Sequence, residues 1–152
     1  MELRKRDEEK RTRDYRIVFI TSTVVILLVV AIFIIKSVFA NPLEGDWNSK
    51  GTGYHIEIDD DGEISIETTV NQVFVEVDAT YTIDKDAKII TIKPELNTYE
   101  EAAKETNNLL TAADIDAKLK EVMTSFDYSL EKDTLTLSER EYGDQFVFTR
   151  VK

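Results

Sequence analysis

The chain has 152 residues, of which 30 are acidic and 19 are basic, so its formal net charge is -11. It contains no cysteine and only one histidine. This composition excludes a disulfide framework, a thiolate nucleophile, a lipid-modified cysteine and a metal site built from several histidines. Hydrophobic residues make up 42% of the chain, which is enough to form a buried core.

Residues 17–35 form an uncharged, apolar run that follows a stretch rich in lysine and arginine. As an α-helix this run would be about 28 Å long, close to the roughly 30 Å hydrocarbon core of a bilayer. It is too long for the core helix of a small soluble domain, and longer than the apolar part of a typical signal peptide. We therefore expect a retained signal anchor over residues 17–39. Cleavage after Ala40 is the alternative, because Val38-Phe39-Ala40 fits the small-residue pattern of a cleavage site.

Charge differs between the two sides of this segment. Residues 1–16 carry seven basic and five acidic side chains, whereas residues 41–152 carry 11 basic and 25 acidic ones. The positive-inside rule then predicts a cytoplasmic tail over residues 1–16 and an extracytoplasmic domain over residues 40–152. The sequence thus predicts a single-pass protein of the cell membrane, with membrane lipid as a partner of the helix. The acidic domain would repel phosphates, which excludes nucleic acid as a main partner.

From residue 41 onward, apolar and polar residues alternate in short segments with a period of two, as in β-strands. Turn signals such as Asp61-Gly62 and Asn71-Gln72 separate the segments. The sequence therefore predicts a mainly β domain of about eight antiparallel strands, in an up-and-down barrel or a closely related curled sheet. Closure removes the unpaired strand edges that would otherwise pair with a neighbouring molecule. The predicted strands contain, in chain order, Trp47, Tyr54, Ile64, Val73, Ile90, Phe126, Leu135 and Phe146.

A helical insert interrupts this pattern at about residues 98–125. Thr98 stands three residues before Glu101, and Thr111 stands three residues before Asp114. Both spacings fit a capping box at the start of a helix. We expect two helices, or one helix broken near Thr111, that pack an apolar stripe on the core. A lid over the mouth of the barrel is the alternative.

The polar residues indicate no catalytic or metal site, and we expect no enzyme activity and no cofactor. Asp59, Asp61 and Gly62 resemble part of a calcium loop, but Thr68 stands where an EF-hand needs its bidentate acid. The Asp-Gly pair predicts a hairpin turn instead. His55 has no nucleophile motif nearby and falls on the outward face of its strand.

Gly45 and Trp47 form a Gly-x-Trp motif on the first predicted strand, and Arg150 ends the last strand. This pattern resembles the calycins, and residues 41–152 resemble the small lipocalin-like domains of membrane-anchored bacterial cell-envelope proteins. The resemblance implies a structural closing pair, in which Arg150 stacks on Trp47 at one end of the barrel. Gly45 would let the backbone pack closely beside this pair.

Two functions from different classes fit these features. The first is a membrane-anchored, extracytoplasmic lipocalin-like module that binds a small apolar ligand, a peptide or an envelope protein. The second is an accessory or structural subunit that docks on a membrane complex without a small ligand. A large apolar cavity bordered by Tyr54, Tyr81 or Phe126 would favour a ligand-binding module. A barrel filled by its own side chains, with an exposed apolar patch on the helices, would favour a docking subunit.

Overall fold

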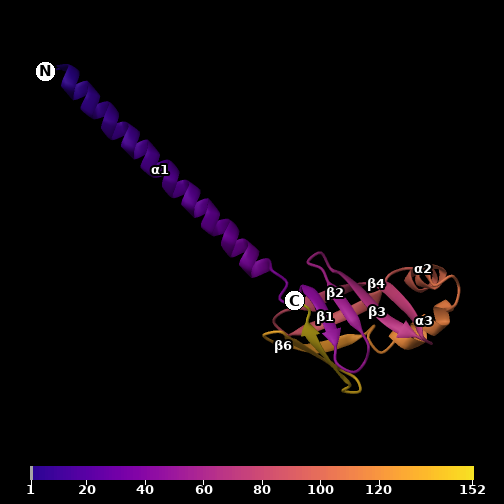
Figure 1. The fold of residues 1–152 in the computed structure, drawn as a ribbon. Helices are drawn as coiled ribbons and strands as arrows, with labels where there is room; N and C mark the ends of the chain where they lie inside the picture. Colours follow the sequence, from indigo (N-terminus) through magenta and orange to yellow (C-terminus); the bar gives the residue numbers. More distant parts are fainter. Residues whose placement is uncertain (1) are drawn as a thin grey trace. The chain divides into compact units, whose positions relative to one another are not determined.

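The computed structural model describes the backbone of residues 2–152 and the side chains of residues 15–35 and 40–152. It divides into two compact units, Met1–Ala40 and Asn41–Lys152. The first unit is helix α1, Glu2–Phe39 (Figure 1). Within α1, the segment Tyr15–Ile35 is long and apolar enough to cross a membrane, with a mean hydropathy of 3.1.

Two threonine hydroxyls within this apolar segment have hydrogen-bond partners in the same helix. Thr21 Oγ1 donates to the carbonyl of Ile17 at 2.8 Å, and Thr23 Oγ1 donates to the carbonyl of Phe19 at 2.9 Å. Bonds of this kind satisfy a hydroxyl without a second helix, so both threonines are compatible with a helix in lipid.

The second unit is a closed barrel in which eight antiparallel strands follow one another in sequence order. Each strand pairs with the next, and β8 pairs with β1 to close the sheet. This confirms the predicted mainly β fold of eight antiparallel strands. The strands are β1 (Gly45–Ser49), β2 (His55–Ile58), β3 (Glu63–Val70), β4 (Val73–Asp84), β5 (Ile89–Pro94), β6 (Ser125–Glu131), β7 (Thr134–Glu139) and β8 (Gln145–Arg150).

Alternation along each strand separates the core from the outer surface. On β4, Val75, Val77 and Ala79 are buried, whereas Glu76 and Asp78 between them are exposed. Successive side chains of a strand point to opposite faces of the sheet, so a period of two places one set inside the barrel. Burying one such aliphatic side chain stabilises the fold by about 1.5–3 kcal/mol relative to leaving it in water.

The helical insert lies between β5 and β6 and consists of α2 (Thr98–Glu105) and α3 (Ala112–Leu119). The prediction of two helices is therefore confirmed. Thr111 caps α3 as predicted, because its hydroxyl accepts a hydrogen bond from the Asp114 backbone N–H and the Asp114 carboxylate accepts one from the Thr111 backbone N–H. Buried Ala102 and Ile115 face the core, so the apolar stripe of each helix is a packing surface.

The predicted capping box at Thr98 is wrong. Thr98 is the first helical residue, and the residue before it, Asn97, has a left-handed conformation with a φ of 63°. The Thr98 hydroxyl instead donates a hydrogen bond to the carbonyl of Asp78 on β4 at 2.8 Å. Because Thr98 is buried against the barrel, the strand carbonyl satisfies its hydroxyl in place of the helix terminus.

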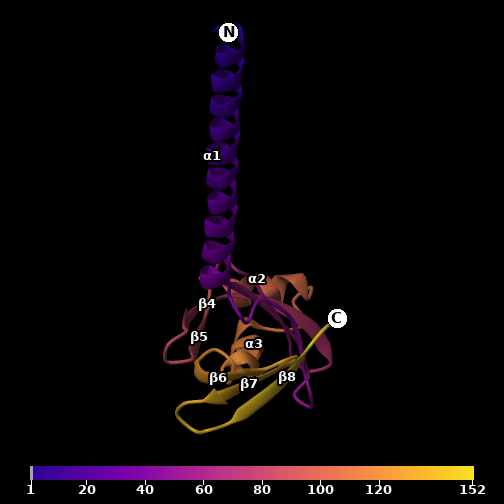
Figure 2. The ribbon, with the colours of Figure 1, turned by 90° about the vertical axis from the view of Figure 1, so that its left-hand side faces the viewer.

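The strand order defines two ends of the barrel. The helical end contains the β1–β2 loop, the β3–β4 turn, α2, α3 and the β7–β8 turn. The terminal end contains residues 41–44, the β2–β3, β4–β5 and β6–β7 turns, and the C-terminus. Figure 1 shows α2 and α3 together at one end and the C-terminus at the other. Figure 2 shows β6, β7 and β8 side by side, which brings the β7–β8 turn close to the segment between α3 and β6.

Candidate functional site

The interior of the barrel is filled by the barrel's own side chains. Trp47, Ile66, Ile90, Phe126 and Leu135 come from five different strands, and each has 0% exposed area. A side chain without exposed area touches no space that admits a water molecule. Protein interiors packed in this way leave no room for a ligand unless side chains move.

The three residues considered for a ligand pocket do not form one pocket wall. The rings of Tyr54 and Phe126 both pack edge-to-face on Phe146, with centroid distances of 6.1 and 5.8 Å. Tyr81 lies at the opposite, terminal end, where its hydroxyl donates to the carbonyl of Asp59 and accepts a hydrogen bond from the Asn41 amide at 2.6 Å. Each of the three side chains therefore contacts other parts of the barrel.

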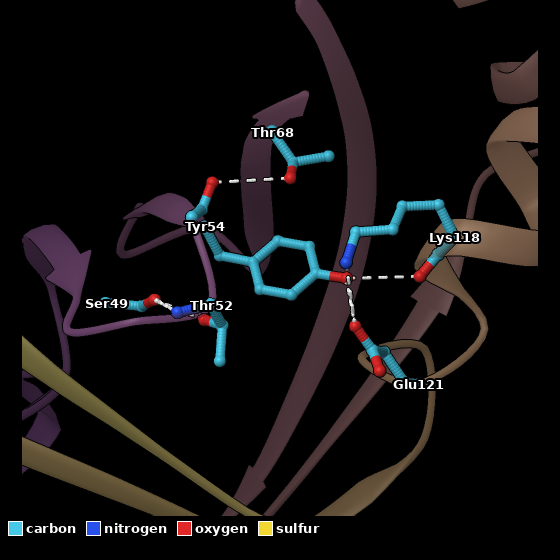
Figure 3. A network of polar contacts seen from close by, with 7 residues as sticks. Ser49, Thr52, Tyr54, Thr68, Lys118 and Glu121 are labelled. Atoms are coloured by element: carbon cyan, nitrogen blue, oxygen red, sulfur yellow. Dashed lines mark hydrogen bonds and ion pairs between the residues drawn. The ribbon is translucent and has the colours of Figure 1, made fainter. Parts of the chain in front are cut away.

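At the helical end, Tyr54 fastens the β1–β2 loop to α3 (Figure 3). Its hydroxyl contacts the carbonyl of Lys118 at 3.1 Å and a carboxylate oxygen of Glu121. The Lys118 ammonium lies 3.2 Å from the same Glu121 oxygen and 4.7 Å from the centroid of the Tyr54 ring. Burial, and then the hydrogen bond to Glu121, raise the pKa of Tyr54 well above its ordinary value. The phenol therefore stays protonated and remains a hydrogen-bond donor.

Further hydrogen bonds hold the β1–β2 loop that carries Tyr54. Thr68 on β3 donates its hydroxyl hydrogen to the carbonyl of Gly53 at 3.3 Å, and the backbone N–H of Ser49 donates to the carbonyl of Tyr54 at 2.8 Å. The Ser49 and Thr52 hydroxyls also contact each other across the loop (Figure 3). These bonds fix the backbone at Tyr54, so its ring is held in position against α3.

At the terminal end, Arg150 lies over Trp47, as the sequence predicts. The guanidinium carbon is 4.2 Å from the centroid of the Trp47 ring, and the two residues are direct neighbours across the β1–β8 pairing. The Trp47 indole N–H donates to the carbonyl of Leu43 at 2.8 Å, and Arg150 Nη1 donates to the carbonyl of Glu44 at 2.7 Å. Both polar groups thus bind the segment that leads into β1.

Gly45 leaves the space through which the Arg150 side chain passes. A Cβ atom at this position would lie 2.6 Å from Arg150 Nη1, which is closer than carbon and nitrogen can approach. Gly45 also has a φ of +123°, a conformation that residues with a side chain rarely adopt. The backbone conformation therefore favours glycine here, and a side chain at this position would also have to displace the Arg150 guanidinium.

The β2–β3 turn brings three exposed carboxylates together. Ligand oxygens of Asp59, Asp61 and Glu63 lie within 4.8 Å of one another. The negative charge of Asp61 is the main cause that raises the pKa of Glu63. Gly62 has a φ of +98°, which confirms the predicted hairpin turn. Thr68, the position tested against a calcium loop, is buried and bonded to Gly53, so it lies outside this cluster.

His55 is a half-buried residue on the outside of β2. Its Nδ1 atom lies 2.8 Å from the side-chain oxygen of Asn48 on the neighbouring strand. This contact links β1 and β2 across the sheet and orients the imidazole ring.

The contacts of Tyr54 include two residues that sequence reasoning missed. Lys118 and Glu121 are 64 and 67 residues away from Tyr54 in the chain. Their pairing depends on how the insert folds back over the barrel, and the sequence carries no local pattern that identifies it.

The chain has no significant match among models of known protein families, curated proteins or solved structures. The architecture is an eight-stranded antiparallel barrel preceded by one apolar helix. This arrangement is compatible with a lipocalin-like fold.

Proposed function

We propose that this chain is a membrane-anchored docking module. In this proposal α1 is the single membrane span, and the barrel is an extracytoplasmic domain that binds another envelope protein through its outer surface. The observation that carries the proposal is the filled interior, where side chains such as Ile66, Ile90 and Phe126 have no exposed area. A ligand carrier needs a cavity of roughly 300–1,000 Å³ that is largely formed before the ligand arrives.

The membrane location rests on the apolar segment and on charge. Tyr15–Ile35 is as long as a bilayer core requires, and the seven basic residues among residues 1–16 favour a cytoplasmic N-terminus. Anionic lipid would then contact the basic residues, and lipid chains would contact the apolar helix. The barrel, with 25 acidic and 11 basic residues, would face the exterior.

The likeness to lipocalin-like domains of bacterial cell-envelope proteins supports the barrel architecture. It gives less support to the idea that the barrel holds a ligand. The residues that carry the likeness are Gly45, Trp47 and Arg150. Here Arg150 stacks on Trp47 and binds the carbonyl of Glu44, and Gly45 leaves space for the guanidinium. We therefore propose that the family pattern serves to close the barrel in this chain. An apolar ligand inside it would have to displace packed rings such as Phe126.

Topology can be tested directly because the chain has no cysteine. Ser129→Cys places a thiol on the exposed face of β6, and Thr12→Cys places one before the apolar segment. We expect a membrane-impermeant maleimide to label Ser129→Cys on intact cells and to label Thr12→Cys only after lysis. The opposite pattern would reverse the proposed orientation, and loss of the N-terminal segment from the mature chain would indicate a cleaved signal peptide.

Docking through the outer surface can be tested by photo-cross-linking of the full chain in the cells that produce it. Benzoylphenylalanine replaces, one at a time, Phe74, Tyr142 and Val147, which are all exposed on the barrel unit. We expect one partner protein to be cross-linked from some of these positions and not from others, because a docking face covers only part of the barrel.

A xenon titration of the full chain in nanodiscs tests the interior. Xenon enters dry apolar cavities and shifts the NMR signals of the methyl groups that line them. We expect no such shift at Ile66, Ile90 or Leu135. Shifted inner methyl signals together with no protein adduct from any outer position would favour a ligand-carrying barrel instead.

A further inference from the structure

A groove of about 420 Å³ lies at the helical end, between the segment that follows α3 and the β7–β8 turn. The two walls come from parts of the chain that the barrel brings together. Residues 117–124 form one wall, and residues 139–144 form the other. The charged and aromatic residues that line it are Lys120, Glu121, Glu139, Glu141, Tyr142 and Asp144. The lining therefore contains four acidic residues and one lysine. The Glu121 and Glu139 carboxylates also bind groups of the protein itself.

The wall formed by the β7–β8 turn has a fixed shape. A carboxylate oxygen of Glu139 accepts hydrogen bonds from the backbone N–H groups of Glu141, at 2.9 Å, and of Tyr142. The N–H of Gly143 donates to the carbonyl of Glu139 at 3.1 Å, and the N–H of Glu139 donates to the carbonyl of Asp144 at 2.8 Å. The hydrogen bond from Tyr142, first among these, lowers the pKa of Glu139, so this carboxylate is ionised at neutral pH.

The opposite wall is fixed by the contacts of Tyr54. Glu121 accepts hydrogen bonds from the Tyr54 hydroxyl and from the Lys118 ammonium, and Tyr54 is itself buried. The end of α3 is therefore tied to the barrel, and both sides of the groove are positioned before any partner arrives. Pre-positioned walls lower the entropic cost of binding.

Tyr142 gives the groove an aromatic surface. Its side chain is 81% exposed, whereas Tyr54, Tyr81 and Tyr128 are buried. An exposed aromatic ring beside carboxylates is the arrangement that recognises an ammonium or guanidinium group, through cation–π attraction and ion pairing. The excess of acidic residues on the barrel unit would also steer a positively charged partner toward it.

We propose that this groove binds a lysine or arginine side chain within an exposed basic segment of a partner protein. The proposal rests on the proposed docking function and names the chemistry of the partner. The β2–β3 turn at the terminal end is also acidic, with the exposed carboxylates of Asp59, Asp61 and Glu63. None of these residues lines the groove. This turn therefore provides a matched control for charge alone.

The test uses the full chain in nanodiscs of neutral lipid and a fluorescent peptide that contains several lysines. The binding variant reverses two groove charges, Glu141→Lys with Asp144→Lys. The control reverses two exposed charges in the β2–β3 turn, Asp59→Lys with Asp60→Lys, and leaves Asp61, which binds the Glu63 N–H, in place. We expect the groove variant to bind the peptide about tenfold or more weakly, which corresponds to about 1.4 kcal/mol of binding free energy. The control variant should bind it less than about threefold more weakly than the unchanged chain. Tyr142→Ala should weaken binding by about threefold to tenfold, from loss of the cation–π contact.

One comparison decides whether a cationic side chain is the recognised group, and one control shows that the variants are folded. The same peptide with acetylated lysines keeps its length and loses its charge, so we expect it not to bind. Fluorescence of Trp47, the only tryptophan in the chain, shows whether each variant has kept its folded barrel. Equal weakening by the groove and control variants, or binding of the acetylated peptide, would overturn the proposal.

Failure of this inference and failure of the docking function give different results. Outer positions can cross-link a protein while the groove substitutions leave binding of the lysine peptide unchanged. In that case the docking function stands, and the proposal of a basic partner is wrong. If spermidine, a free polyamine, binds the groove and excludes the peptide while no protein cross-links, the groove binds a small cation, and the proposed protein partner is wrong.

Discussion

Replacement of Arg150 by alanine tests how the terminal end of the barrel is held closed. The guanidinium makes two contacts that alanine loses, the stacking on Trp47 at 4.2 Å and the hydrogen bond to the carbonyl of Glu44 at 2.7 Å. A cation–π contact at a partly buried site contributes about 1 kcal/mol. The hydrogen bond contributes about 1 kcal/mol, because water replaces it in part when the arginine is removed. We therefore expect Arg150→Ala to lower the free energy of unfolding by about 2 kcal/mol.

The measurement is a urea titration of the full chain in detergent micelles, followed by the fluorescence of Trp47 and by circular dichroism. Arg140→Ala is the matched control, since Arg140 makes one exposed ion pair with Asp127 at 3.4 Å. Exposed pairs of this kind contribute about 0.2–1 kcal/mol. If Arg150→Ala costs no more than Arg140→Ala, the stacked pair does not stabilise the closure, and the argument for a structural pair fails.

Three further substitutions test other parts of the fold. Tyr54→Phe removes the hydroxyl that fastens α3, and we expect a loss of about 1 kcal/mol in the free energy of unfolding together with faster amide exchange in α3. Thr111→Ala removes the N-cap of α3 and should cost about 1 kcal/mol by the same urea titration. Asp61→Asn should lower the raised pKa of Glu63, which an NMR titration of its carboxyl carbon measures. A raised carboxyl pKa in the folded state means that stability increases as the pH falls through that pKa. Asp61→Asn should therefore raise the melting temperature at neutral pH. It should also make the gain in stability on acidification smaller. An unchanged Glu63 pKa would contradict this account.

The eight strands were predictable because the signal is local. Along each strand, apolar residues occupy nearly every inward position and polar residues occupy most positions between them. Turn residues mark where each strand ends. Closure followed from the same pattern, since a sheet of eight short strands without closure exposes two edges. The cap at Thr111 was predictable for a similar reason, because its partner Asp114 is three residues away.

Contacts between distant segments were not predictable. Thr98 has the spacing of a helix cap, yet its hydroxyl binds a carbonyl on β4, 20 residues earlier. The groove depends on the pairing of β6 with β7 and of β7 with β8, which sets the β7–β8 turn beside residues 117–124. The sequence also indicates which side chains point inward, but it does not tell whether their volumes fill the barrel. That depends on the exact register of all eight strands.

A filled barrel with both ends fixed limits where binding can occur. Arg150 binds the backbone at the terminal end, and Tyr54 binds the end of α3 at the helical end. Ligand entry would require these contacts to break and packed side chains to move, whereas the turns on the outer surface are available without such a change. A rigid scaffold that presents loops is a common basis for recognition, because it positions contact residues at little entropic cost. Substitutions of Arg150 and Tyr54 should therefore change stability, and substitutions of Glu141 and Tyr142 should change binding while leaving the barrel folded.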